Sequence, residues 1–411
     1  MTGNSYYSNE EYERKREIRR ARVEAEKARQ NRNKKLFLGG LILLALLLLI
    51  VFAIVMIVKL AGKNKKVNIE DSLSPASLVS TQIPEKEDPI DVTVGDIESG
   101  EELKPGDEPS VSDETGSQGL GNLTKRFDVS ADEFRFVSDT DTKDMSSEEF
   151  TSEYGYVVCL DTGKVLASKS GFEKMFPASM TKIMTVLTAR IYISDEHLDD
   201  VVKLSYNAKA YDLKYGCSSA GYEEGETLTV RDLFYGTILP SGAEAAYMLA
   251  EYTAGTHEDF VDLMNETVKD LGLQDTTHFA NCVGVYDDNN YSNCNDIAVI
   301  LAAAMQDEFL AEVLGTRRYT SSGSEFHTQG VELSNWFLRR IEDKDTGGYV
   351  CGAKTGFVNQ SGCCGASMMK GDDGKTYICV SGKAWSSWRC IYDHVAAYNI
   401  YAIGNTGYHK G

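Results

Sequence analysis

The pattern of hydrophobic and polar positions divides the chain into four parts. Leu36–Val58 is an apolar run of 23 residues without a charge, long enough to cross a bilayer as a helix. Val67–Thr124 contains 14 Asp or Glu and no aromatic residue, a composition that buries too little apolar surface to fold. From Tyr154 onward, short alternating and helical patterns indicate a packed domain. We therefore predict a cytoplasmic charged segment, a transmembrane helix, an extracellular acidic linker and a folded domain, over residues 1–35, 36–58, 59–140 and 141–411.

Within the folded domain, strand-like patterns lie near both ends and helical patterns lie between them. The predicted strands form two pairs, each joined by a turn containing Asp and Gly, and the predicted helices show apolar residues at a spacing of three and four. The strands are Tyr154–Leu160, Lys164–Ser168, Gly365–Met369 and Thr376–Ser381; helices begin at Ser179 and cover Val230–Tyr252, Asp296–Met305 and Trp388–Ile403. This order predicts an α+β fold, with an antiparallel sheet built from both chain ends, flanking helices and a helical insertion.

The distribution of charged residues predicts the membrane topology, and the net charge argues against one class of partner, nucleic acid. Nine Lys or Arg lie between Arg16 and Lys35, against four between Lys59 and Leu78. The positive-inside bias places the N-terminus in the cytoplasm and everything after Lys66, including the folded domain, outside the cell membrane. A net charge of −20 argues against a nucleic-acid partner. The basic run before the apolar segment is typical of a helix lying beside anionic lipid.

The cysteines and histidines give no support to a metal or redox site. All nine cysteines follow residue 158 and none forms a C-x-x-C pair, and the six histidines include no H-E-x-x-H pattern. The odd number of cysteines leaves at least one thiol without an intramolecular disulfide. The sequence leaves open whether the others form disulfides or are buried as small apolar residues.

Ser179 and Lys182 are the first candidate catalytic pair. Residues three apart lie on one face of a helix, so a lysine amine can reach the serine hydroxyl and, where burial disfavours its charge, accept the proton. Ser367 and Lys370 have the same spacing. They fall in a predicted strand, where residues three apart point to opposite faces. Only the first pair therefore satisfies the geometry.

Two further short motifs follow the first pair in the sequence. Ser241, in Leu-Pro-Ser-Gly, is either a hydroxyl presented to a cleft or an ordinary N-cap of the next helix. Lys354, in Lys-Thr-Gly, either displays a cation on a strand beside a glycine that lets a ligand approach the backbone, or lies in a surface turn. Each of these short motifs alone is weak evidence for a catalytic site, and their order along the chain is stronger evidence.

That order, Ser-x-x-Lys, Ser-Gly and Lys-Thr-Gly, resembles the penicilloyl-serine enzymes. From about Tyr154 to Gly404 the chain resembles the D-alanyl-D-alanine carboxypeptidases, the low-molecular-weight penicillin-binding proteins, in segments such as SMTKIMTVLTA, LPSGAEAAYMLAE and GAKTGFVNQSG. The resemblance implies a β-lactamase/transpeptidase-like fold, covalent inhibition by β-lactams, and the removal of D-alanine from peptidoglycan pentapeptide stems without cofactor or metal. It implies a nucleophile, its general base, two proton-relay groups and substrate contacts at Ser179, Lys182, Ser241, Lys354, Thr355, Gly356, Phe357 and Arg389.

One departure from the family pattern concerns the second motif. The family usually has asparagine two positions after the second-motif serine, where this chain has Ala243, so we expect altered substrate positioning. No Glu-x-x-Leu-Asn stretch, which in class A β-lactamases activates the deacylating water, lies between the second and third motifs. Efficient β-lactam hydrolysis is therefore not expected. A β-lactamase, a D,D-transpeptidase and a catalytically weak wall-binding relative stay as alternatives.

Overall fold

A computed structural model describes residues 120, 123–405 and 407–408 of the chain. The predicted cytoplasmic segment, the predicted transmembrane helix and most of the predicted linker lie outside the described residues. Among the helices within those ranges, none has the length and apolar character needed to span a bilayer. The packed region begins before residue 141, because Val129 and Phe134 are buried in the core and the Arg126 amide donates to Ile191 O at 2.7 Å.

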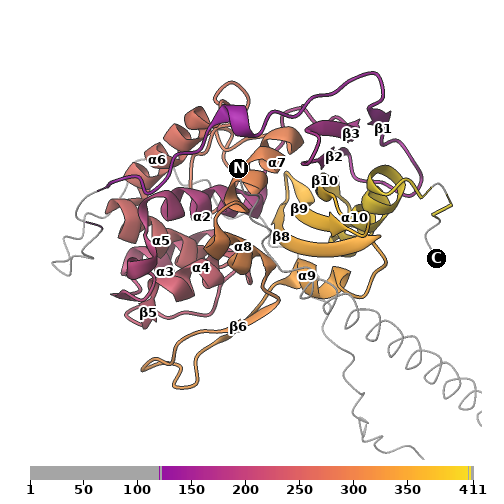
Figure 1. Ribbon diagram of the computed structural model, residues 1–411. Coiled ribbons are helices and arrows are strands. Elements are labelled where there is room, and N and C mark those ends of the chain that lie inside the picture. The colour runs from indigo at the N-terminus through magenta and orange to yellow at the C-terminus, as the bar shows by residue number, and fades with distance from the viewer. Residues whose placement is uncertain (1–119, 121–122, 406, 409–411) are drawn as a thin grey trace, which may run out of the picture. The chain divides into compact units, whose positions relative to one another are not determined.

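A six-stranded sheet joins the two ends of the folded region (Figure 1). Its spatial order is β1-β3-β2-β10-β9-β8, with β1 parallel to β3 and every other neighbouring pair antiparallel. The strands are β1 (Lys143–Asp144), β2 (Tyr154–Cys159), β3 (Lys164–Lys169), β8 (Gly348–Val358), β9 (Gly362–Gly371) and β10 (Thr376–Ala384). Both predicted strand pairs are confirmed, and the long edge strand β8 carries the Lys-Thr-Gly motif.

The segment between β3 and β8 is mainly helical. Its helices are α2 (Thr181–Tyr192), α3 (Tyr206–Tyr215), α4 (Val230–Ile238), α5 (Ala243–Ala254), α6 (His257–Asp270), α7 (Cys294–Ala304), α8 (Glu308–Gly315) and α9 (Trp336–Ile341). Two small antiparallel pairs accompany them: β4 (Val201–Lys203) with β5 (Thr227–Thr229), and β6 (Arg318–Thr320) with β7 (Glu332–Ser334). After β10, α10 (Ser387–Ala397) runs into a short π-helix, Tyr398–Ala402. The predicted helical insertion is confirmed.

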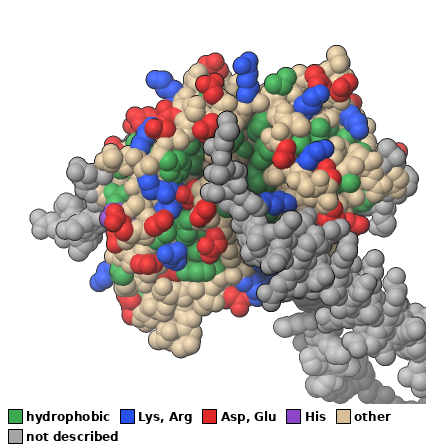
Figure 2. All heavy atoms as spheres, viewed as in Figure 1, with side chains coloured by type: hydrophobic (Ala, Val, Ile, Leu, Met, Phe, Trp, Pro, Cys, Tyr) green, Lys and Arg blue, Asp and Glu red, His purple; other side chains and the backbone are tan. Residues whose placement is uncertain are grey.

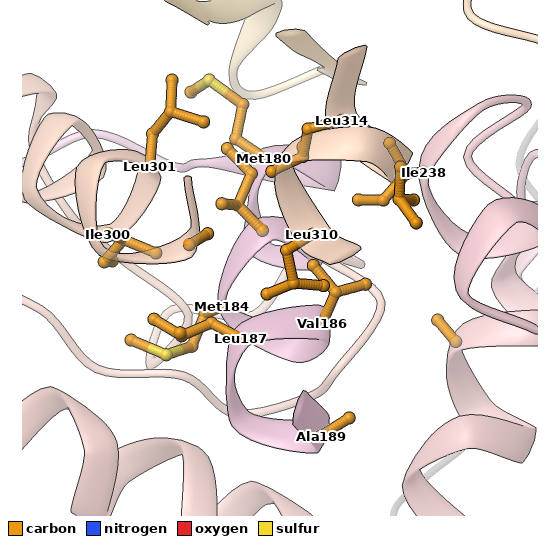
Figure 3. Packing of buried hydrophobic residues seen from close by; sticks show 14 of the residues in the cluster. Met180, Met184, Val186, Leu187, Ala189, Ile238, Ile300, Leu301, Leu310 and Leu314 are labelled. Atoms are coloured by element: carbon orange, nitrogen blue, oxygen red, sulfur yellow. The ribbon is translucent and has the colours of Figure 1, made fainter. Parts of the chain in front are cut away.

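The larger of two hydrophobic cores surrounds α2, of which every residue from Thr181 to Ile191 is buried. A helix that is buried on all sides has no solvent face, and α2 buries two charged residues, Lys182 and Arg190, together with its apolar ones. Figure 3 shows Met184 and Leu187 of α2 packed among side chains of α7 and α8, including Ile300 and Leu310. The candidate pair Ser179 and Lys182 therefore lies at the start of a helix that is held by its surroundings.

The second core lies on the other face of the sheet, under α9 and α10. Ser367 of β9 is fully buried there, with its Oγ 2.7 Å from His394 Nδ1, and Ser381 Oγ lies 3.0 Å from His394 Nε2. Burial lowers the pKa of His394 to about 3, so the ring is neutral at pH 7. The second Ser-x-x-Lys match thus belongs to a strand, as predicted, and its serine is a buried packing residue.

Acidic and basic side chains are interspersed over the face of the described region that Figure 2 shows. No continuous basic area is visible on that face.

Candidate active site

Ser179 and Lys182 meet at the start of α2. Ser179 lies in the 3-10 turn Ala178–Met180 and Lys182 in the first turn of the helix that follows. Lys182 Nζ is 3.1 Å from Ser179 Oγ and 2.9 Å from Val283 O. The lysine is buried and the serine is part-exposed. The predicted pair is therefore in hydrogen-bond contact, with the hydroxyl open to a substrate.

Burial lowers the pKa of Lys182 and so favours the neutral form of its amine. Loss of hydration is the largest effect on the Lys182 amine and lowers its pKa to about 8. Burial also raises the pKa of Cys282 to about 12 and that of Cys217 above its usual value. Both thiols are therefore neutral at pH 7 and do not stabilise the ammonium. Glu244 and Asp212 are the acidic groups left to do so.

The turn that presents Ser179 has an unusual backbone, supported by a loop from a distant segment. Ala178 has φ of 47° and Gly284 has φ of 90°. A Cβ on Gly284 would lie 2.0 Å from Ala178 O, so only glycine fits. Asn281 fixes this loop through its Oδ1, which accepts the amides of Gly284 at 2.7 Å and Val285 at 3.1 Å. Asn281 and Gly284 lie outside the three short motifs, so the motifs give them no role.

Strand β8 brings the third motif against the nucleophile. A Cβ on Gly356 would lie 3.0 Å from Ser179 N and 2.8 Å from Pro177 O, so glycine permits this contact. The contact places the backbone of Ser179 beside that of Gly356 and Phe357, as an oxyanion hole requires. Lys354 is fully buried, and burial first, then the Lys182 charge, lowers its pKa well below the usual value. Thr355 is part-buried on the same edge strand.

Ser241 lies in the turn between α4 and α5. Its φ is 68°, and its Oγ is buried without a hydrogen-bond partner among the described residues. The N-cap of α5 is Gly242, so the alternative that Ser241 caps the helix is wrong. An unpaired buried hydroxyl costs about 1–3 kcal/mol. A ligand that supplies the missing partner accounts for its retention.

Glu244 supports the second motif and was not predicted. It is fully buried, and its Oε1 accepts hydrogen bonds from Ser219 Oγ at 2.6 Å and from three consecutive backbone amides, those of Ala220, Gly221 and Tyr222, at 2.7, 3.0 and 3.3 Å. The amide of Ala243 donates to Ser218 O at 2.8 Å. The loop is thus held against the turn that contains Ser241. The family's usual asparagine is replaced by a small buried side chain beside this loop.

The structure does not bring Arg389 to the site, which corrects the expectation that it contacts substrate. Its side chain is buried beneath α10, with Nε 2.7 Å from Asp393 Oδ1, and the guanidinium also donates to Glu149 O. The Asp393 carboxylate in turn accepts the amide of Ser152 at 2.9 Å. Arg389 therefore ties α10 to the segment before β2 and has no free face for a ligand.

Comparison with known proteins settles the family. The sequence profile of the D-alanyl-D-alanine carboxypeptidases, peptidase family S11, matches residues 141–380, more than half of the chain. The chain belongs to this family. The matched range contains the Ser-x-x-Lys, Ser-Gly and Lys-Thr-Gly sequences of this chain.

Individual relatives agree with the family match. The chain is 31% identical over 215 residues to the D-alanyl-D-alanine carboxypeptidase DacF of Bacillus subtilis, covering 52% of each protein. It is 37% identical over 151 residues to DacD of Salmonella typhimurium, covering 36% of this chain and 38% of the relative. The chain thus spans about half the length, or less, of these curated carboxypeptidases.

Solved structures share the fold. The DD-transpeptidase of Streptomyces K15 is 28% identical, with a TM-score of 0.55 over 61% of this chain and 97% of that one. A D-alanyl-D-alanine carboxypeptidase from Mycobacterium tuberculosis is 21% identical, with a TM-score of 0.55 over 64% of this chain and 96% of that one. The α+β DD-peptidase fold is therefore confirmed for the carboxypeptidase-family region.

Proposed function

We propose that this protein is a serine-type D-Ala-D-Ala carboxypeptidase that removes the terminal D-alanine from peptidoglycan pentapeptide stems. The observation that carries the proposal is the 3.1 Å hydrogen bond between Lys182 Nζ and Ser179 Oγ, made by a lysine that is buried and of lowered pKa. The curated relatives named above carry the same activity in their names.

The first half-reaction forms an acyl-enzyme. Ser179 Oγ attacks the carbonyl carbon of the penultimate D-alanine and gives its proton to the neutral amine of Lys182. The oxyanion lies between the amides of Ser179 and Phe357. As the peptide C–N bond breaks, the proton held by Lys182 passes through the hydroxyl of Ser241 and the amine of Lys354 to the departing D-alanine nitrogen, and Lys182 is neutral again. Thr355 binds the terminal carboxylate.

The second half-reaction regenerates the serine. Water adds to the acyl carbonyl, gives a proton to Lys182, and the ester C–O bond breaks, so that Ser179 recovers its hydrogen and the shortened stem leaves as a carboxylate. In a β-lactam the departing nitrogen stays attached through the opened ring. A slowly hydrolysed adduct on Ser179 is the expected outcome.

The location of the catalytic domain, anchored to the membrane and outside it, is also a proposal. The uncharged run over residues 36–58 and the distribution of Lys and Arg around it support a single-pass anchor with a cytoplasmic N-terminus. The acidic segment that follows supports an extended tether outside the membrane. Peptidoglycan stems would then lie within reach of the catalytic domain.

The rate of acylation is expected to rise about tenfold per pH unit up to about pH 8 and to level off above it. The reason is that the reactive form of Lys182 is the neutral amine, which is lost as the pH falls below its pKa. The measurement is the rate of fluorescent-penicillin labelling between pH 5.5 and 9.5, with unfolding monitored at each pH. A rate that falls as the pH rises through this range would contradict the assignment of Lys182 as base.

The proposed function is tested by incubating the full chain with a soluble stem peptide ending in D-Ala-D-Ala and measuring released D-alanine. Peptide mass mapping after penicillin labelling is expected to place one adduct on Ser179. Exchange with an added D-amino acid that exceeds hydrolysis would favour a transpeptidase, and rapid multiple turnover of a β-lactam would favour a β-lactamase. An adduct on any residue other than Ser179 would refute the central assignment.

A further inference from the structure

Cys217 is one of two cysteines whose thiols are partly open to solvent. All nine cysteines lie in the described region and are free thiols; Cys217 and Cys363 are half-buried and the other seven are buried. Cys363 lies at the start of β9 and packs against the second core. Cys217 follows the end of α3 and packs against the larger core, which surrounds α2. Of the two accessible thiols, only that of Cys217 is therefore beside the core that carries the candidate site.

The backbone on both sides of Cys217 holds it beside the second motif. Gly216 ends α3 with φ of 58°, and the amide of Cys217 donates to Asp212 O at 3.2 Å. The carbonyl of the next residue, Ser218, accepts the amide of Ala243 at 2.8 Å. Cys217 is thus fixed between the end of α3 and the first residue of α5, two helices that lie side by side (Figure 1).

The Cys217 thiol is also an electrostatic neighbour of Lys182. Burial raises the pKa of this thiol, and the charge of Lys182 is the largest effect that opposes the rise. The interaction of two charges falls with the distance between them, so the sulfur and the Lys182 amine lie close together. A group attached to the Cys217 sulfur would therefore stand beside the general base of the proposed reaction.

The second motif offers no side chain of its own at the position next to this thiol. Ala243, where the family usually has asparagine, is fully buried and has no polar atom in its side chain. Two residues earlier, Ser241 is 8% exposed, and its Oγ has no hydrogen-bond partner among the described residues. A buried hydroxyl without a partner points to a ligand at this turn. The accessible side chain that packs beside the turn is that of Cys217.

We propose that Cys217 borders the bound acyl group in place of the missing asparagine, and that its modification by a small disulfide closes the site around Ser179. The Cys217 thiolate, its proton lost to solvent, attacks one sulfur of the disulfide; a new S–S bond forms, the old one breaks, and the other half leaves as a thiolate that takes up a proton. Cys217 is oxidised and the departing thiol is reduced. The inference rests on the proposed function, because the acyl group is the one that Ser179 receives.

The modification experiment uses the full chain carrying Cys363→Ser, which leaves Cys217 as the accessible thiol, and oxidised glutathione at about pH 8.5 as the reagent. The mixed disulfide on Cys217, located by peptide mass mapping, is expected to slow fluorescent-penicillin labelling about tenfold or more. Penicillin bound first is expected to slow the modification of Cys217 in turn. In a chain that also carries Cys217→Ser, the labelling rates with and without reagent are expected to be equal. Normal labelling of the chain modified at Cys217, or no adduct on Cys217, overturns the inference.

An unfolding experiment decides the place of Cys217 without any reaction at Ser179. Ala243→Asn is expected to lower the urea midpoint of the full chain, because the larger side chain meets the Cys217 loop. In a chain carrying Cys217→Ala the fall is expected to be about half as large or less, since the space of the thiol is then free. Cys363→Ala is the matched control and leaves the fall unchanged.

The two experiments fail in different ways. If penicillin labels no residue of the unaltered chain, the proposed function fails, and the urea comparison still decides whether Cys217 occupies the place of the asparagine. Equal falls of the midpoint with and without the Cys217 thiol overturn the inference alone.

Discussion

Replacing Lys182 by arginine is expected to slow the acylation of Ser179 by about 10²–10⁴-fold, the usual contribution of a general base. Arginine keeps a positive charge of similar reach but does not deprotonate in proteins. Because Lys182 is buried against Ser179 Oγ and Val283 O, no solvent base has access from its side. The measurement is the second-order rate of fluorescent-penicillin labelling of the full chain.

The chain provides a matched control for this substitution. Lys370 is also the fourth residue of a Ser-x-x-Lys sequence, but Ser367 before it is buried against His394 and Tyr398. Lys370→Arg is therefore expected to leave the labelling rate unchanged. If both variants label at the normal rate, Lys182 is not the base. A circular dichroism spectrum and an unfolding midpoint for each variant show whether a slow rate reflects loss of the fold.

Gly284→Ala is expected to lower the free energy of unfolding by roughly 2–4 kcal/mol and to slow acylation at the same time. Two effects add: alanine is strained at φ of 90°, and its Cβ would lie 2.0 Å from Ala178 O and 2.9 Å from Ser179 N. Relief of that overlap moves the backbone that presents the nucleophile. Urea unfolding and penicillin labelling of the same preparation measure the two effects.

Gly374→Ala measures the backbone strain of alanine at a positive φ without a steric clash of its Cβ. Gly374 has φ of 85°, and a Cβ there would have nothing within 4 Å. This variant is expected to lose only about 1 kcal/mol, the cost of the left-handed backbone alone, and to keep the normal labelling rate. Equal losses of stability in the two variants would show that the contact between Gly284 and Ala178 has no role in holding the nucleophile.

The features that sequence predicted best are those fixed by local geometry. Ser179 and Lys182 are three residues apart, in a 3-10 turn and in the first turn of α2 that continues it, so their contact follows from the helical repeat. The strand assignment of Ser367 likewise follows from alternation in β9. The positions of Ser241 and Lys354 relative to this pair came from the order of motifs in a known family, because no local rule joins residues so far apart.

Two site features show where sequence reasoning fails. The role of Glu244 depends on amides more than twenty residues earlier, which meet its carboxylate only after α3, α4 and α5 have packed. Arg389 was assigned to the substrate because of its place after the last strand. A signal was available: Asp393 lies four residues later, the spacing of an ion pair on one helix. Because the Arg389 guanidinium pairs with the buried carboxylate of Asp393 on the same helix, it is not available for the substrate contact that the family resemblance implies.

The pairing of β2 with β10 has a consequence for when the candidate site is assembled. Cys159 lies opposite Tyr377, so the central pair of the sheet closes a loop of more than 200 residues, and such closures are slow. The nucleophile helix can form early from local contacts, but β8 has no sheet to join until β9 and β10 are present. A newly synthesised chain therefore carries Ser179 for some time without the neighbouring strand β8. Under the proposed function, we expect acylation by a β-lactam to begin only when folding is complete.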